Sequence, residues 1–143
     1  MQTSFTDKQL LDKDNKSSES ILRKCVHCGM CNATCPTFCV NGEELEGPRG
    51  RIYLIKDMLE NKKPANKKIV KHIDSCLSCY SCMTTCPSGV NYMHLIDHGR
   101  NYVEETYKRP FFDRLFRNVL SFVLPRPKVF LVLAYLTKLI KPF

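Results

Sequence analysis

The residues best suited to chemistry in this sequence are cysteines, and eight of the nine fall into two runs with the same spacing. In each run the cysteines are separated by two, two and three residues, and a proline follows the fourth. The two runs are Cys25, Cys28, Cys31 and Cys35, and Cys76, Cys79, Cys82 and Cys86. Because thiolates are soft ligands, closely spaced cysteines are typical of iron–sulfur or zinc sites. The repeat therefore predicts two metal centres.

The spacing C-x2-C-x2-C-x3-C-P is that of bacterial ferredoxins with two [4Fe–4S] clusters, where the fourth cysteine ligates the other cluster. Three cysteines at i, i+3 and i+6 let one tight loop supply three ligands to a cube. Crossed ligation then assigns Cys25, Cys28, Cys31 and Cys86 to cluster 1, and Cys76, Cys79, Cys82 and Cys35 to cluster 2. Because neither loop can be positioned without the other, cluster assembly and folding should be coupled.

Two other interpretations fit the cysteines less well. Structural zinc sites usually take two ligands from each of two separated knuckles. Disulfide frameworks are typical of short secreted chains, and nothing resembling a secretory signal precedes Cys25. Cluster ligands must also stay reduced, which predicts a cytoplasmic protein.

The formal net charge of +8 counts every thiol as neutral. Eight thiolates and two oxidised cubes of about +2 each would bring the loaded protein near +4, by an order-of-magnitude count. The basic composition therefore does not argue for nucleic acid, and we recognise no nucleic-acid-binding motif. A mildly basic surface would suit acidic partners or the anionic inner leaflet of a membrane.

Between the cysteine runs, two glycines flank a Pro-Arg pair in Gly47-Pro48-Arg49-Gly50-Arg51, which allows close approach of the backbone. We expect Arg49 and Arg51 to lie beside a buried anionic cube, where N–H groups and guanidinium charge would raise its reduction potential. The alternative is an ordinary turn with solvated arginines. The ninth cysteine, Cys39, is expected to be a small buried apolar residue, because both cubes are complete without it.

The four histidines carry weaker signals. His94 and His98 stand at i, i+4 and could ligate a metal, but no carboxylate completes the set, so we expect them at the surface or in a cap. His27 and His72 adjoin the cysteine loops. Packing is their expected role, and the alternative is that they tune a potential or couple it to protons.

The rest of the sequence predicts an all-α protein, a helical ferredoxin-like domain with two [4Fe–4S] clusters followed by an amphipathic helical arm. Residues 1–16 are polar and of mixed charge, which predicts a flexible tail; the alternative is a short helix capped by Thr6 and Gln9. Residues 17–108 are expected to form the cluster domain, with helical apolar patterns over 52–60, 69–73 and 92–108.

Residues 109–143 are expected to form the arm. Over 110–124, apolar residues repeat every four positions in two adjacent rows opposite a charged and polar face, which predicts a strongly amphipathic helix. A Pro-Arg-Pro break separates it from a second helix over 128–141. The longest apolar run, Val129 to Leu136, is far shorter than the roughly 20 residues of a membrane span. So much apolar surface must be covered by more of the chain, a partner subunit or a membrane surface.

Several stretches beyond the cysteines narrow the family. They are SILRKCVHCG at 20–29, EGPRGRIYLIK at 46–56, TCPSGV at 85–90, LID at 95–97 and PRP at 125–127. From about residue 20 to its end, the sequence resembles the iron–sulfur subunits of bacterial glycolate oxidases. The cysteine runs alone are shared with the electron-transfer subunits of succinate dehydrogenase, anaerobic glycerol-3-phosphate dehydrogenase and heterodisulfide reductase.

This resemblance implies two [4Fe–4S] clusters and flavin-containing partner subunits that oxidise glycolate to glyoxylate. Electrons would pass from the flavin through the cubes toward a membrane acceptor such as a quinone, in the cytoplasm or peripherally on the cytoplasmic face of the inner membrane. No oxidation activity is expected of this chain alone. Two alternatives stay open: a subunit of another dehydrogenase (glycerol-3-phosphate, lactate or heterodisulfide reductase type), and a structural cluster-binding module.

One departure from the family concerns the C-terminal part. Family members continue into a long cysteine-rich region with Cys-Cys-Gly motifs, whereas no cysteine follows Cys86 here. We therefore expect this sequence to be the N-terminal portion of such a subunit, with the arm leading into a truncated C-terminal region.

Overall fold

The computed structural model describes residues 1–140, with side chains as far as Leu136. All regular secondary structure in this part of the chain is helical, which confirms the all-α prediction. The chain divides into two compact units, Met1–Tyr107 and Lys108–Phe143. Each unit has its own helices and is described separately.

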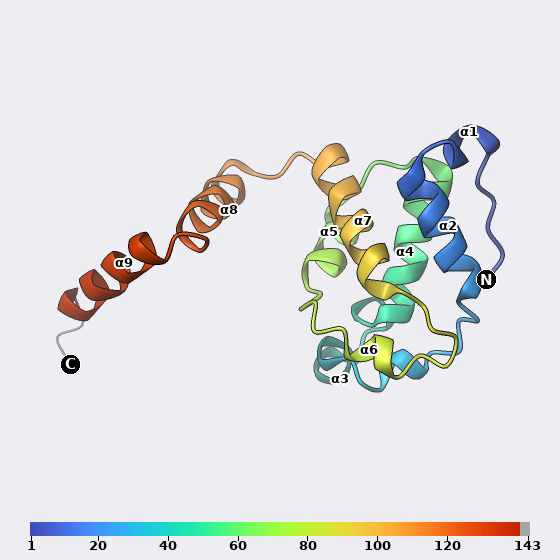
Figure 1. The fold of residues 1–143 in the computed structure, drawn as a ribbon, viewed down its shortest axis with the longest axis horizontal. Helices are drawn as coiled ribbons and strands as arrows, with labels where there is room; N and C mark the ends of the chain where they lie inside the picture. Colours follow the sequence, from blue (N-terminus) through green and yellow to red (C-terminus); the bar gives the residue numbers. More distant parts are fainter. Residues whose placement is uncertain (141–143) are drawn as a thin grey trace. The chain divides into compact units, whose positions relative to one another are not determined.

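Unit 1 carries both cysteine runs. Its helices are α1 (Asp7–Leu10), α2 (Lys13–Lys24), α3 (Pro36–Asn41), α4 (Pro48–Asn61), α5 (Lys67–Asp74), α6 (Ser81–Thr84) and α7 (Tyr92–Thr106), with 3₁₀ turns η1 (Met30–Asn32) and η2 (Glu44–Glu46). Helices α2, α4 and α7 pack against one another, and α3 and α6 lie at the end of the unit opposite α1 (Figure 1). Both cysteine loops therefore gather at that end.

Short polar signals decide where the helices of unit 1 begin. The side chain of Asn66 accepts a hydrogen bond from the Ile69 amide at 3.0 Å and caps α5. Asn91 caps α7 in the same way, through the His94 amide. Pro48 occupies the first turn of α4, where its missing N–H group leaves no bond unmade. The starts of α4 and α7 lie beside the cysteine loops, because Pro48 and Tyr92 line the cysteine cavities, whereas α5 leads into the second loop at its C-terminal end.

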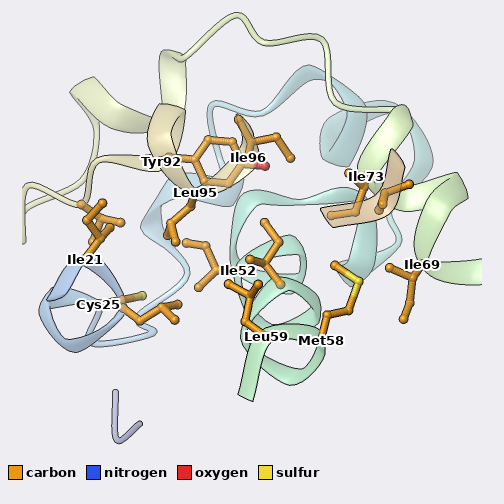
Figure 2. Close-up of a cluster of buried hydrophobic side chains, with 14 of the residues drawn as sticks. Ile21, Cys25, Ile52, Met58, Leu59, Ile69, Ile73, Tyr92, Leu95 and Ile96 are labelled. Atoms are coloured by element: carbon orange, nitrogen blue, oxygen red, sulfur yellow. The ribbon is translucent and has the colours of Figure 1, made fainter. Parts of the chain in front are cut away.

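The core of unit 1 lies between α2, α4, α5 and α7 (Figure 2). Among its fully buried side chains are Leu22, Ile55, Met58, Ile73, Leu95, Ile96 and Val103. Burial of each such side chain contributes roughly 1.5–3 kcal/mol. Gly99 lets α7 approach α4 closely, because a Cβ atom there would lie 2.8 Å from Cγ1 of Ile55.

The prediction of a flexible tail over residues 1–16 is wrong. Thr6 and Gln9 form a capping box that begins α1, and residues from Lys13 onward already belong to α2. Gln9 is buried, and its Nε2 donates to the carbonyl oxygens of Leu59 at 2.8 Å and Glu60 at 3.0 Å. Those carbonyls lie in the last turn of α4, where they lack helical partners. One buried amide therefore anchors a segment whose composition resembles a tail.

The described part of unit 2 contains α8 (Phe111–Val123) and α9 (Pro127–Ile140), which agree with the two predicted helices, although Lys141 of the second prediction lies outside the described residues. Most of its large apolar side chains are exposed, with Phe112 at 81% and Phe116 at 64%. No single helix in the described part of the chain is long and apolar enough to cross a membrane. By length and composition, only α8 together with α9 as far as Leu136 would reach that limit, and the pair is bent by 111°.

The close approach of α4 and α7 predicts coupled substitutions. Gly99→Ala should destabilise unit 1 by about 1–3 kcal/mol, because the new methyl group collides with Ile55. Ile55→Ala should also destabilise it, by leaving a cavity. In the double variant each change relieves the other, so the fall in anaerobic melting temperature should be smaller than the sum of the single falls. Additive losses would contradict the packing described.

Candidate iron–sulfur centres

The two cysteine loops adopt the same unusual backbone. His27 and Ser78, two residues after the first cysteine of their runs, have φ angles of 58° and 52°. Gly29 and Tyr80, two residues further on, have φ angles of 84° and 56°. These left-handed conformations cost about 1–3 kcal/mol at each non-glycine residue and persist only where the surroundings hold them. Ligation of a cluster by the enclosed thiols would supply that constraint.

A first cavity is enclosed mainly by the first loop. The cysteines that line it are Cys25, Cys28, Cys31, Cys82 and Cys86. Arg49 and Ile52 of α4 complete one wall. The fourth cysteine of the second run therefore lies with the first three cysteines of the first run, as crossed ligation predicts for cluster 1.

A second cavity has the reciprocal composition. The cysteines that line it are Cys35, Cys76, Cys79 and Cys82, the set predicted for cluster 2. Arg51 and Thr37 lie on its wall. Pro48, Cys82 and Tyr92 line both cavities, so the two sites adjoin. The individual ligand assignments stay predictions, and variants can test them.

The spacing of these thiols suits clusters better than single ions. Among the described residues, the one group of three ligand atoms lying within 4.8 Å of one another belongs to Glu43, Glu46 and His72. No cysteine trio in that part of the chain is so tight, whereas tetrahedral zinc bonds of about 2.3 Å bring sulfur atoms within roughly 4 Å. Four soft thiols spread around a cavity fit a larger group that bridges them.

Burial keeps several of these thiols protonated in the absence of metal. Desolvation, reinforced by Cys25, raises the pKa of Cys31 to about 11. Desolvation, with Cys31 next in effect, raises the pKa of Cys82 to about 12. Hydrogen bonds from the backbone and side chain of Ser81 lower the pKa of the exposed Cys79. Since the ligands are thiolates, assembly must release protons from the buried thiols.

Arg51 is held at the second cavity by a buried network. Its guanidinium donates to the carboxylate of Glu46 at 3.0 Å and to the carbonyl oxygen of His72 at 2.6 Å. It also donates to the hydroxyl groups of Thr37 and Ser75 at 3.1 and 3.0 Å. Its Nη1 lies 3.9 Å from Sγ of Cys35. Four fixed contacts thus hold a positive charge against a predicted ligand of cluster 2.

The carboxylate of Glu46 is already occupied. Its Oε1 lies 2.7 Å from Nδ1 of His72, and Ser75 donates to Oε2. Burial alone would raise the pKa of Glu46, but hydrogen bonds from Ser75 and His72 and the charge of Arg51 hold it below its usual value. A cation bound by Glu43, Glu46 and His72 would face the Arg51 guanidinium, so we interpret this group as an ion-pair network.

Arg49 faces the first cavity from a more open position. Its Nε donates to Glu44 at 2.5 Å, and the two side chains are 33% and 46% exposed. The solvated-turn alternative does not describe Arg51, which is buried at the second cavity, whereas Arg49 lines the first cavity and is partly solvated. The expected close approach of the backbone is also present, because a Cβ atom on Gly50 would lie 2.7 Å from Cα of Leu45.

The prediction that Cys39 is buried is wrong. Its thiol is exposed and lies 3.5 Å from the carbonyl oxygen of Ala33, and Cys39 lines neither cysteine cavity. The reason is that α3 lies on the surface and contributes no buried residue. The sequence pattern could not show this, because a four-residue apolar stretch does not indicate which side faces the core.

The histidines divide between packing and polar roles. His72 is buried in the Glu46 network, whereas His27 lines the first cavity. His98 is half-buried, and its Nδ1 lies 2.7 Å from Oγ of Ser18, which links α7 to α2. His94 is also half-buried, and its amide receives the cap of α7. The surface placement expected for His94 and His98 is therefore only partly present.

Two residues at the site were not singled out from the sequence. Glu46 stands five positions before Arg51. Ion pairs on one helix join residues three or four positions apart, so the sequence did not indicate this pair. Tyr92 follows the cap of α7 and looks like an ordinary helix residue, yet it is 3% exposed and its hydroxyl group lies 3.7 Å from Sγ of Cys76. The hydroxyl group of a buried tyrosine usually has a polar partner, and this general rule was the one indication that Tyr92 could lie near a ligand.

Comparison with protein families agrees with this geometry. Residues 21–90 match the family described as a 4Fe-4S dicluster domain. This chain carries a 4Fe–4S dicluster domain. The match covers both cysteine runs and identifies the cofactors as two [4Fe–4S] clusters. The residues that surround the two cavities fit such groups, and zinc is not the metal that this family binds.

Curated relatives confirm the resemblance. The chain is 49% identical over its 143 residues to the glycolate oxidase iron–sulfur subunit of Escherichia coli, covering 35% of that protein. It is 31% identical over 117 residues to the probable glycolate oxidase iron–sulfur subunit of Bacillus subtilis, which is 78% of this chain and 26% of that one. Both relatives are therefore named as members of the family that the sequence resembles.

A more distant relative shares the cluster region. The mitochondrial succinate dehydrogenase [ubiquinone] iron–sulfur subunit of Candida glabrata is 27% identical over 84 residues, 54% of this chain and 33% of that protein. No solved structure matches the chain significantly. The chain spans about a quarter to a third of the length of these curated relatives.

Crossed ligation predicts which cluster a variant loses. Cys35→Ser should reduce the iron content from about eight to about four atoms and remove the cluster held by Cys76, Cys79 and Cys82. Cys39→Ser makes the same chemical change within α3, four residues after Cys35 and away from both cavities, and should leave both clusters intact. Iron and sulfide analysis with EPR of anaerobic protein measures both results. Loss confined to the first cluster in Cys35→Ser would refute the crossed assignment.

Proposed function

We propose that this chain is the electron-transfer part of a glycolate-oxidising complex. The observation that carries the proposal is the pair of adjoining cavities, each lined by a predicted ligand set, with Pro48, Cys82 and Tyr92 in common. Two one-electron centres separated by shared side chains can pass electrons singly along a short path. A structural module would need no such adjacency, and this favours the relay over the structural alternative.

The names of the relatives support the proposed substrate and partner. Two of them are named as iron–sulfur subunits of glycolate oxidase, and the E. coli protein shares 49% identity with the whole chain. Oxidation of glycolate to glyoxylate releases two electrons and two protons. A flavin-containing subunit would accept the electron pair and pass it on singly, because flavins carry this chemistry and the protein around them supplies orientation and charge. The clusters of this chain would then relay the electrons toward a membrane acceptor.

Unit 2 supports a peripheral position at the cytoplasmic face of the inner membrane. Residues 108–143 hold eight lysines and arginines and one acidic residue, so seven of the eight net positive charges lie there. Helix α8 exposes one apolar face, with Arg114, Arg117 and Asn118 on the opposite face. A basic amphipathic helix of this kind binds in the plane of an anionic interface.

The function can be tested with the anaerobic, cluster-loaded chain and the flavin-containing subunits. Addition of glycolate should give the EPR signals of reduced [4Fe–4S] clusters, and omission of the flavin subunits should abolish them. Reduction by lactate or glycerol-3-phosphate but not by glycolate would assign the chain to another dehydrogenase. Zinc in place of iron, or clusters that never reduce, would favour the structural alternative.

The proposed membrane contact predicts that an added carboxylate weakens vesicle binding more on the apolar face of α8 than on its polar face. Phe116→Asp places a carboxylate on the apolar face of α8, whereas Asn118→Asp places it on the polar face. Both variants change the net charge by the same amount. Sedimentation with anionic vesicles should therefore show at least a tenfold weaker binding for Phe116→Asp and a small loss for Asn118→Asp, since burying a charge at the interface is unfavourable. Equal losses would indicate charge attraction alone.

A further inference from the structure

Each cysteine cavity has its own carboxylate–guanidinium pair, and both pairs join η2 to α4. Glu44 pairs with Arg49 at the first cavity, and Glu46 pairs with Arg51 at the second. The first pair is 46% and 33% exposed, whereas the side chains of the second are 3% and 1% exposed. Because water and salt screen exposed charges strongly, the field of Arg51 at its cavity is much the stronger.

The buried guanidinium has a fixed orientation. Nη1 of Arg51 faces Sγ of Cys35 at 3.9 Å, while Nη2 binds the Glu46 carboxylate at 3.0 Å. The other contacts, to Thr37, Ser75 and the carbonyl of His72, prevent the side chain from turning away. The cation is thus in contact with the sulfur, and its counter-charge is bound at the other nitrogen.

A second donor reaches the same predicted ligand set. The hydroxyl group of Tyr92 lies 3.7 Å from Sγ of Cys76. A phenol is protonated at neutral pH, so this hydroxyl group donates toward the sulfur. Two of the four cysteines in this set, Cys35 and Cys76, therefore face a side-chain donor.

The first set has a different environment. Among the described residues, the side-chain polar contact of Cys25, Cys28, Cys31 and Cys86 is that of Cys31 Sγ with Oδ1 of Asn32, at 3.9 Å. That oxygen also accepts from the Arg49 amide, and Nδ2 of Asn32 donates to Glu44, which fixes the orientation of the amide. A side-chain acceptor faces the first set, whereas the guanidinium of Arg51 and the hydroxyl group of Tyr92 face the second, in which Sγ of Cys35 also lies 3.7 Å from the carbonyl oxygen of Glu46.

We propose that the cluster at Cys35, Cys76, Cys79 and Cys82 has the higher reduction potential, and that Arg51 and Tyr92 maintain this difference. Hydrogen bonds and positive charge at the sulfur atoms stabilise the added electron. A single electron that reaches the first cluster then passes to the second. The first cluster returns to its oxidised state, and the second becomes reduced. No proton or atom needs to move. The inference rests on the proposed electron-transfer function and adds a direction to it.

The test is an EPR-monitored redox titration of the anaerobic, cluster-loaded chain. The signal lost in Cys79→Ser identifies the second cluster, and in the unmodified chain this signal should appear first as the potential is lowered. Arg51→Gln should make reduction of that cluster about tenfold less favourable, which is about 59 mV for one electron. Tyr92→Phe removes one hydroxyl group and little volume. It should lower the reduction potential of the same cluster, and the equilibrium constant for its reduction should fall about several-fold.

Glu46→Gln removes the negative charge paired with Arg51 and should raise the reduction potential of the second cluster. This shift is opposite to that of Arg51→Gln, whereas a merely structural role would not give shifts of opposite direction. Arg49→Gln and Tyr53→Phe are the matched controls, since one alters the exposed pair and the other an exposed ring, and both should leave this potential unchanged. Equal shifts at both clusters in Tyr92→Phe, no shift, or a lower potential for the second cluster would overturn the inference. Clusters that reduce as described but do not respond to glycolate would overturn the proposed function alone.

Discussion

The buried ion pair between Glu46 and Arg51 organises the cysteine-bearing end of unit 1. It joins η2 to α4, and the guanidinium reaches α3 through Thr37 and the segment before the second loop through Ser75 and the carbonyl of His72. Removing either charge would leave the other buried without compensation, which typically costs about 3–5 kcal/mol. The positions of Cys35 and Cys76 therefore depend on one electrostatic contact as well as on the apolar core.

The two cysteine loops reach equivalent shapes from different residues. Where the first loop uses Gly29 in a left-handed conformation, the second uses Tyr80. The second loop also receives Arg100, which donates to Ser78 and to the carbonyl oxygen of Cys76 at 2.6 and 2.7 Å. The repeat thus preserves the placement of the thiols, while its surroundings differ in charge and hydrogen bonding. That asymmetry allows two clusters of the same type to have different potentials.

Charge is divided unevenly along the chain. Residues 1–107 hold 14 basic and 13 acidic residues, so they are nearly neutral before any cluster is bound. Each oxidised cube with four thiolates contributes about −2, which makes loaded unit 1 negative. Unit 2 carries the positive charge and the exposed apolar surface. The two units therefore differ in charge as well as in the amount of exposed apolar surface.

The sequence by itself determined the cofactor and the helical character of both units, and it predicted how the two cysteine runs share their ligands. These features depend on local spacing, which one loop or one helix face expresses within a few residues. Cys39 and residues 1–16 were misjudged because their burial depends on contacts with distant segments, such as that of Gln9 with the end of α4.

Only the tertiary structure showed that Glu46, Arg51 and Tyr92 converge on one ligand set. These three residues come from η2 and from two different helices, 46 positions apart at the widest. No local pattern records such convergence, because it depends on how α4 and α7 pack through Gly99 and on the close approach of η2 at Gly50. The spacing of cysteines specifies a cluster, but the packing of helices around it specifies its electrostatic environment.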